Sequence, residues 1–174
     1  MKILVTAFQP FNNQDNNYSL EVLNYIKNVD KLLIDVVYDN CYNEIINKVN
    51  IDEYDLIVSL GEARSREELT LEVVAKNISS CSLKDNEGNL KKDELIDPFA
   101  SDSLRTKVDV NKVKDEVKLS FDAGKFVCNN LYFHLLENHP DKAIFTHVPN
   151  CHNDVKMYQK YAKKINLIID KLLS

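Results

Sequence analysis

Short apolar runs alternate with amphipathic segments over the first sixty residues, and this alternation restricts the fold more than any other feature of the chain. Residues 2–8, 31–38 and 55–60 are short, apolar and rich in β-branched side chains, which is typical of buried strands. Residues 19–28 and 42–49, which lie between them, carry apolar side chains at helical spacing. The order strand, helix, strand, helix, strand predicts a three-layer α/β/α sandwich with a mostly parallel, twisted central sheet.

The rest of the chain is less regular until its last segment. Residues 69–78 have the composition of a strand, and residues 142–148 form another buried apolar run. Between them lies a long polar excursion, residues 83–106, followed by residues 111–120, which we expect to be helical. Residues 154–173 give the clearest helical pattern, with apolar side chains recurring every three or four positions and lysines on the opposite face.

Length and composition narrow the class of protein. A chain of 174 residues without repeats or linkers predicts one domain over residues 1–174, in which Ser19 is the expected N-cap of the first helix. The formal charge of −5 argues against nucleic acid as a partner. No apolar run approaches the ~20 residues of a membrane span, and the apolar start MKILVTAF is too short for a signal peptide. Four cysteines without CxxC pairing are typical of reduced thiols, so we expect a cytoplasmic protein that does not bind membranes.

Candidate catalytic side chains fall where an α/β sheet binds its ligands, beyond the carboxyl ends of the strands. Glu62 and Arg66 follow the strand at 55–60, and His147 closes the strand at 142–148. Cys128 begins an apolar segment that is expected to be helical, and a helix N-terminus lowers the pKa of a thiol. A cysteine there and a histidine elsewhere are the minimum for nucleophilic catalysis by a thiol.

Each of these residues also fits an ordinary structural role. Cys128 fits a small buried side chain, His147 a hydrogen-bonded histidine at a strand end, and Glu72 a carboxylate on an exposed strand face. His147, Cys151 and His152 are all metal-ligand types, but the spacing in HVPNCH matches no established metal motif. Residue types alone leave these alternatives open.

Several ordered blocks of the sequence resemble the pyroglutamyl-peptidase I family of cysteine exopeptidases. The start KILVTAFQPF resembles the family's ILVTGFxPFGG, and LGEARSREELTLEVVAKNI resembles GQAGGRxxITxERVAxNI. Further along, DNEGN at 85–89 matches a family block, AGKFVCN at 123–129 resembles AGTFVCN, and FTHVP at 145–149 resembles FIHVP. The blocks cover most of the chain, and the match around Cys128 is the most specific.

The resemblance implies a function and a set of site residues. It places Cys128 on the nucleophile, His147 on the general base and acid, and Glu72 on the residue that orients the imidazole, with Arg66 as a supporting or oxyanion-stabilising residue. It implies hydrolysis of the amide bond after an N-terminal pyroglutamyl residue through a thioester, without metal or organic cofactor. The partners implied are pyroglutamyl peptides and, for assembly, a homodimer or homotetramer. The substrate slot that the resemblance implies is lined by Phe8, Phe11, Asn17, Glu62 and Phe126.

The sequence departs from the family around that slot. Asn12 and Asn13 replace two glycines, and asparagine tolerates positive φ better than most residues. Glu62 replaces a glutamine, which removes an N–H donor, and Lys125 replaces a threonine near the nucleophile, where an ammonium would lower the thiol pKa. The family has glycine at three further positions in this region, which are Ala7, Arg64 and Ser65 here.

These departures lead us to expect that the chemistry is kept while affinity or substrate range is altered. Two alternatives stay open. One is a thiol hydrolase of the same fold with altered acyl or ring specificity, and the other is a non-catalytic peptide-binding homologue. The intact set of Cys128, His147 and Glu72 disfavours the second.

Overall fold

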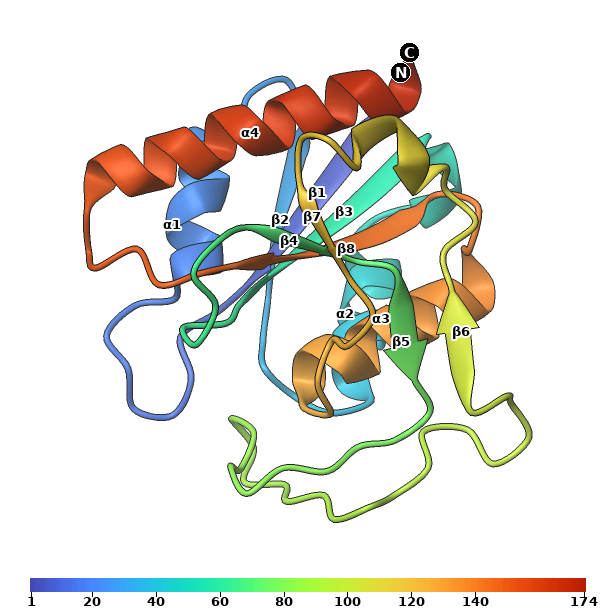
Figure 1. Cartoon of the computed structure of the whole chain (residues 1–174). Helices are drawn as coiled ribbons and strands as arrows, with labels where there is room; N and C mark the ends of the chain where they lie inside the picture. The colour runs from blue at the N-terminus through green and yellow to red at the C-terminus, as the bar shows by residue number, and fades with distance from the viewer.

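A six-stranded, mostly parallel sheet forms the centre of the protein, as a computed structural model describing all 174 residues shows (Figure 1). Five strand pairings hold it together, and only β4 runs antiparallel to its neighbour β8. In spatial order its strands are β2 (Asp30–Ile34), β1 (Ile3–Phe8), β3 (Leu56–Glu62), β8 (Ala143–Val148), β4 (Thr70–Glu72) and β7 (Lys118–Ser120). A separate two-stranded antiparallel sheet consists of β5 (Val74–Lys76) and β6 (Ser103–Arg105).

Helices cover both faces of the large sheet, which confirms the predicted three-layer α/β/α arrangement (Figure 1). One layer contains α1 (Tyr18–Tyr25) and α4 (Val155–Leu173), and the other contains α2 (Asn40–Lys48) and α3 (Val127–Asn138). Two short 3₁₀ turns complete the elements, η1 (Ile51–Glu53) and η2 (Val110–Val113).

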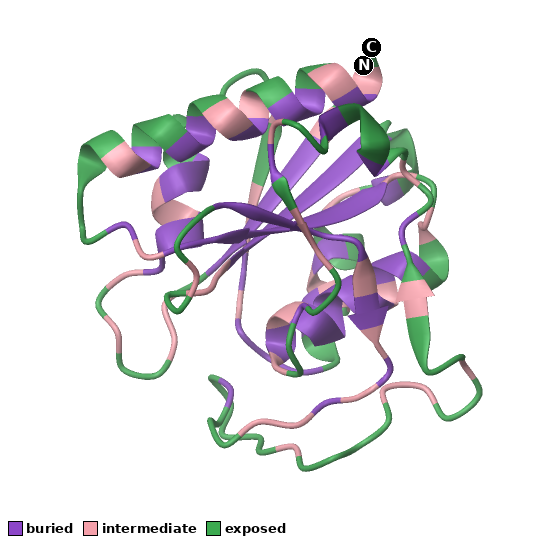
Figure 2. Cartoon of the chain, in the orientation of Figure 1, coloured by how far each residue is buried: buried purple, intermediate pink, exposed green.

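The central strands are buried because a helix layer packs on each of their faces (Figure 2). Every residue of β8 is buried, and α4 presents Ile165 and Ile169 to one side of the sheet. On the other side α3 contributes Leu131 and Leu135 to a second core. Packing in the two apolar cores therefore fixes the position of the start of α3 relative to the ends of the strands.

Three local expectations were wrong or incomplete. Residues 111–120 form one 3₁₀ turn and then β7, because the open edge of β4 is satisfied by pairing with residues 118–120. The predicted strand 69–78 is divided at Val73 into β4 and β5, which belong to different sheets. The N-cap of α1 is Asn17, whose Oδ1 accepts a hydrogen bond from the backbone N–H of Ser19, so Ser19 lies inside the helix.

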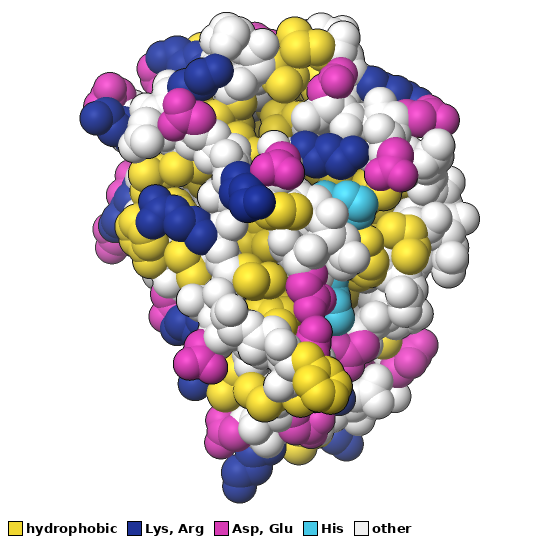
Figure 3. Space-filling view, turned by 90° about the vertical axis from the view of Figure 1, so that its right-hand side faces the viewer, with side chains coloured by type: hydrophobic (Ala, Val, Ile, Leu, Met, Phe, Trp, Pro, Cys, Tyr) yellow, Lys and Arg dark blue, Asp and Glu magenta, His cyan; other side chains and the backbone are white.

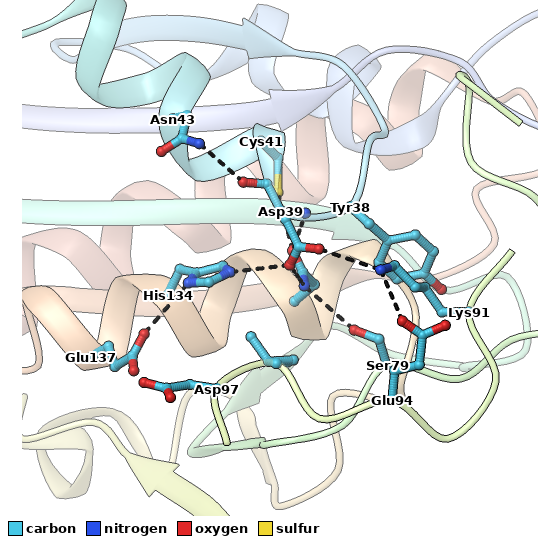
Figure 4. Close-up of polar contacts among 12 residues, drawn as sticks. Tyr38, Asp39, Cys41, Asn43, Ser79, Lys91, Glu94, Asp97, His134 and Glu137 are labelled. Atoms are coloured by element: carbon cyan, nitrogen blue, oxygen red, sulfur yellow. Dashed lines mark hydrogen bonds and ion pairs between the residues drawn. The ribbon is translucent and has the colours of Figure 1, made fainter. Parts of the chain in front are cut away.

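The excursion between β5 and β6 is tied to α2 and α3 by a polar cluster (Figure 4). His134 of α3 lies between two carboxylates, with Nε2 3.4 Å from Asp39 Oδ1 and Nδ1 3.5 Å from Glu137 Oε2. Lys91, on the excursion, reaches both Asp39 (3.6 Å) and Glu94 (3.0 Å). Charge pairing thus anchors a segment that has almost no secondary structure of its own.

None of the helices combines the length and the apolar character that a membrane span requires. On the face shown in Figure 3, acidic and basic side chains are interspersed with apolar ones, and no continuous basic area forms.

Asn12 and Asn13, which stand where the family pattern has glycine, both adopt positive φ (54° and 55°), so asparagine keeps the left-handed turn here.

Candidate active site

A buried histidine–carboxylate pair joins two neighbouring interior strands of the sheet, β8 and β4. His147 Nδ1 lies 2.8 Å from Glu72 Oε1, and both side chains are buried. In the antiparallel register of β8 and β4, Glu72 is opposite Phe145 and His147 is opposite Thr70, so the pair is a diagonal cross-strand contact on one sheet face. Nδ1 therefore carries a proton toward the carboxylate, which leaves Nε2 available for proton transfer.

The thiol of Cys128 is held in the first turn of α3. Phe126 is the N-cap, in an extended conformation, and Gly124 just before it adopts φ +79°, a turn that favours glycine. Cys128 and His147 line one cavity of about 330 Å³. The predicted helix start at Cys128 is confirmed, and it brings the cysteine and the histidine to a common space.

Gly61 of β3 makes room for the sulfur. A Cβ atom at Gly61 would lie 2.6 Å from Cys128 Sγ and 2.8 Å from Phe145 Cζ, too close for either atom. Gly61 is also the strand partner of His147. The sulfur therefore lies directly against β3, beside the strand that carries the histidine.

Two asparagines that follow the nucleophile fix the start of α3. Asn129 exchanges hydrogen bonds with the backbone of Lys76, accepting from its N–H and donating to its C=O, both at 2.9 Å. Asn130 does the same for the N-cap of α2, since it accepts from Asp39 N–H (2.9 Å) and donates to Asp39 Oδ1 (2.8 Å). Both side chains are fully buried. Sequence reasoning assigned no role to them or to Gly61, because their partners are distant in sequence.

The electrostatic environment of Cys128 differs from the expectation for a helix start. Burial, followed by the negative charges of Glu72 and Glu62, raises the pKa of Cys128 to about 12. The backbone N–H of Cys128 and the charge of Arg66 oppose this rise but do not outweigh it. Lys125 is not among the groups that act most strongly on this pKa. The Cys128 thiol is therefore protonated near neutral pH, and a base is required to remove its proton.

Arg66 supports the carboxylate of the site. Its Nη2 lies 2.8 Å from Glu72 Oε1, its Nη1 donates to Thr70 Oγ1 (2.8 Å), and Nη2 also donates to the backbone C=O of Asp122 (2.7 Å). Glu72 Oε1 therefore has two cationic or N–H partners, whereas Oε2 has no hydrogen-bond partner. The charge of a fully buried carboxylate is compensated in this way, and Arg66 acts through Glu72.

Three phenylalanine rings contribute to the lining of the cavity beside the thiol. All five residues expected in the substrate slot line it, together with Val36: Phe8, Phe11, Asn17, Glu62 and Phe126. The rings of Phe11 and Phe126 are 5.6 Å apart, and Tyr38 meets Phe126 edge to face at 5.5 Å. A small flat apolar group fits such a slot.

Glu62 is not a free carboxylate on the cavity wall. Its Oε2 accepts from the backbone N–H of Tyr18 (2.7 Å), and its Oε1 lies 2.8 Å from Arg64 Nε. The Arg64 guanidinium in turn stacks over the Tyr18 ring at 4.4 Å. Arg64 therefore neutralises the charge that Glu62 brings to the wall.

No metal centre is formed at this site. No three side chains among the histidines, cysteines, aspartates and glutamates of the chain come together as ligands. Cys151 is buried, and its thiol donates to the backbone C=O of Pro149 (3.3 Å).

A thiol that shares a cavity with a histidine held by a buried carboxylate provides the residue types that thiol-dependent hydrolysis requires, and this arrangement is typical of cysteine peptidases. The sequence profile of pyroglutamyl peptidase matches residues 1–166, and the chain belongs to this family. It is 31% identical over 167 residues to the pyrrolidone-carboxylate peptidase of Brachyspira hyodysenteriae, covering 86% of this chain and 83% of that relative. The corresponding protein of Staphylococcus carnosus is 34% identical, with 86% and 78% covered.

Solved structures share the fold over nearly the whole chain. The pyrrolidone carboxyl peptidase of Fervidobacterium islandicum AW-1 superposes with a TM-score of 0.85 at 22% identity, covering 99% of this chain and 98% of its own. Pyroglutamyl peptidase I of Bacillus amyloliquefaciens gives a TM-score of 0.84 at 23% identity, with 98% and 96% covered. The profile match and the relatives above 30% identity confirm the family resemblance of the sequence blocks, and the solved structures confirm the fold.

Proposed function

We propose that this protein hydrolyses the amide bond that follows an N-terminal pyroglutamyl residue, using Cys128 as the nucleophile. The observation that carries the proposal is the 2.8 Å His147–Glu72 pair, whose histidine lines the same cavity as Cys128 and three phenylalanine rings. The pyroglutamyl ring is a flat, uncharged lactam, and the rings of Phe11 and Phe126 offer it an apolar slot.

The first half of the reaction forms a thioester. His147 Nε2 takes the thiol proton as Cys128 Sγ attacks the carbonyl carbon of the pyroglutamyl residue. The negative charge on the carbonyl oxygen is stabilised by the backbone N–H of Cys128 at the start of α3. The imidazolium then gives its proton to the nitrogen of the departing peptide, and the C–N bond breaks.

The second half releases the acid. His147 takes a proton from water, whose oxygen attacks the thioester carbon, and the C–S bond breaks as the proton returns to sulfur. Throughout, Glu72 holds the ring orientation and stabilises the imidazolium. A proton-accepting histidine is required because the pKa of Cys128, about 12, keeps the thiol protonated near neutral pH. No cofactor takes part in these steps.

A cytoplasmic location and peptide partners complete the proposal. All four cysteines are free thiols, which supports a reducing compartment. Pyroglutamyl peptides are the partners that the cavity suits.

A second candidate function is a thiol hydrolase of the same fold with altered ring specificity. It is favoured by one observation: both carboxylate oxygens of Glu62 are already engaged, by Tyr18 N–H and by Arg64. A carboxylate whose oxygens already bind groups of the protein is less able to accept a hydrogen bond from the polar edge of the lactam.

Release of a fluorophore from a pyroglutamyl amide, compared with a prolyl amide, tests these alternatives. Faster turnover of the pyroglutamyl amide supports the proposal, and faster turnover of the prolyl amide supports the second candidate. Cys128→Ala is expected to lower kcat by about 10⁴-fold or more. Cys81→Ala, a half-buried cysteine outside the cavity, serves as the matched control and should leave kcat unchanged. Turnover that survives in Cys128→Ala would rule out the mechanism.

A further inference from the structure

The mouth of the catalytic cavity carries one charged group without a partner, the ammonium of Lys125. Lys125 lines the cavity, is exposed to solvent, and forms neither an ion pair nor a side-chain hydrogen bond. Each other charged side chain of the lining is paired: Glu62 with Arg64 (2.8 Å), Arg66 with Glu72 (2.8 Å) and Asp122 with Lys76 (3.0 Å). The mouth therefore has one uncompensated positive charge in a chain whose formal charge is −5.

The position of Lys125 in the lining places it on the side of the departing peptide. The enclosed part of the cavity is formed by the rings of Phe8, Phe11 and Phe126, none of which is exposed. An uncharged acyl ring bonded to Cys128 fits there. The exposed residues of the lining form the opening instead: Ser65, Asp122, Gly124 and Lys125. A peptide that continues from the acyl group must leave through this opening and pass the ammonium.

Asp122 does not cancel this attraction. Its Oδ1 is 3.0 Å from Lys76 Nζ and also accepts from the backbone N–H of Gly124 (2.9 Å). These contacts, with the bond to Gly124 first, lower the pKa of Asp122, so its charge is held within its own pair. Lys125 is the remaining charge that a ligand meets.

We propose that Lys125 is a specificity-determining residue that favours substrates whose departing peptide carries a carboxylate close to the scissile bond. The inference rests on the proposed function. The carboxylate can come from an acidic side chain in the residue after pyroglutamate or from the free C-terminus of a dipeptide. An exposed ion pair of this kind changes kcat/KM by about two- to fivefold, and salt screens it over a Debye length of about 10 Å at 0.1 M.

Four substrates test this specificity: pyroglutamyl-alanine amide, pyroglutamyl-glutamate amide, pyroglutamyl-lysine amide and pyroglutamyl-alanine with a free carboxyl group. For the native protein we expect kcat/KM to be highest for the two carboxylate substrates and lowest for the lysine one. The glutamate amide and the free acid separate the two sources of the carboxylate. Lys125→Thr should abolish the preference, Lys125→Arg should keep it and Lys125→Glu should reverse it, where the preference is the ratio of kcat/KM for the glutamate amide to kcat/KM for the alanine amide within each variant.

The outcomes separate the two proposals. Equal kcat/KM for acidic and neutral substrates, or a preference that survives in Lys125→Thr, would overturn this inference while alanine amide turnover upholds the proposed function. Absence of turnover for all four substrates would overturn the proposed function and this inference with it. A preference that weakens between 0.05 M and 0.5 M NaCl in the native protein, and is absent in Lys125→Thr, would establish the electrostatic origin.

Discussion

At the scale of single residues, two departures from the family pattern compensate each other. Glu62 brings a negative charge to a cavity wall where only 2% of its side chain is exposed, and Arg64 supplies the matching positive charge from a position where the family has glycine. Either change alone would leave a charge without its partner, because a buried carboxylate requires a counter-ion or several donors. The two positions therefore form one unit.

A double-mutant cycle measures this coupling. Arg64→Gly should lower the free energy of unfolding by about 1–2 kcal/mol, because Glu62 would retain only the Tyr18 N–H, while water reaches part of the site. Arg64→Gly combined with Glu62→Gln should recover most of that loss, since the amide oxygen still accepts from Tyr18. Urea unfolding of the four proteins gives the coupling free energy. Additive effects of the two substitutions would show that they are independent.

The proposed catalytic residues were predictable only through resemblance. Local pattern placed Cys128 at a helix start and His147 at a strand end, but Glu72 looked like an ordinary strand carboxylate. The raised pKa of Cys128 was not predictable, because the charges of Glu72 and Glu62 act on it across the fold. Pairings between distant residues decide such electrostatics, and one sequence does not reveal them.

At the scale of elements, the continuous apolar runs were predicted correctly, and among the amphipathic segments only residues 111–120 were predicted wrongly. β1, β3 and β8 are buried on both faces. A prediction that misplaced their bounds by a residue would therefore still bury apolar side chains. Residues 111–120 have helical spacing of Val113 and Val117, yet residues 118–120 extend to pair with β4. Edge pairing is a non-local interaction that overrides local propensity.

The contact between α2 and α3 predicts a pH-dependent stability. A hydrogen bond from His134, followed by one from Asn130, lowers the pKa of Asp39 to about 2. Because the unfolded carboxyl has a pKa near 3.9, this stabilisation is complete above about pH 4 and is lost as the pH falls toward 2. Asp39 is 53% exposed, so solvent screening keeps the effect below about 1 kcal/mol.

Urea unfolding at pH 5 and pH 3 tests this dependence. Asp39→Asn should be less stable than the native protein at pH 5, and this difference should shrink by about half at pH 3, because the native carboxyl is then only part of the way to its folded pKa of about 2. Asparagine tolerates the left-handed backbone (φ 60°) but carries no charge. Asp141→Asn, an exposed aspartate without an ion pair, is the control. The same difference from native at both pH values would exclude a contribution from titration of Asp39.

At the scale of the whole molecule, the apolar core beneath α4 lies on the side of the sheet opposite α3 and Cys128. Ile165 of α4 is 1% exposed in the core opposite α3, and it does not line the catalytic cavity. Ile165→Ala should cost about 2–5 kcal/mol of the free energy of unfolding through lost burial and a cavity. Its kcat/KM per folded molecule should equal that of the native protein.

Thermal unfolding and active-site titration of the folded fraction check this separation. Lys163→Ala, on the exposed face of the same helix, should leave both quantities unchanged. A fall in kcat/KM of folded Ile165→Ala would show that the α4 layer also sets the geometry of the site.

The position of β8 between β3 and β4 has a consequence for the order in which the site forms during translation. The proposed base, His147, lies on the strand at residues 143–148, and the carboxylate of Glu72 lies on a strand some seventy residues earlier. The proposed nucleophile, Cys128, lies between them in sequence and meets them only when β8 inserts between β3 and β4. A nascent chain that ends before β8 has a thiol but no base. Proteolytic activity therefore arises only after β8 has joined the sheet. An incomplete chain cannot cleave the peptides around it.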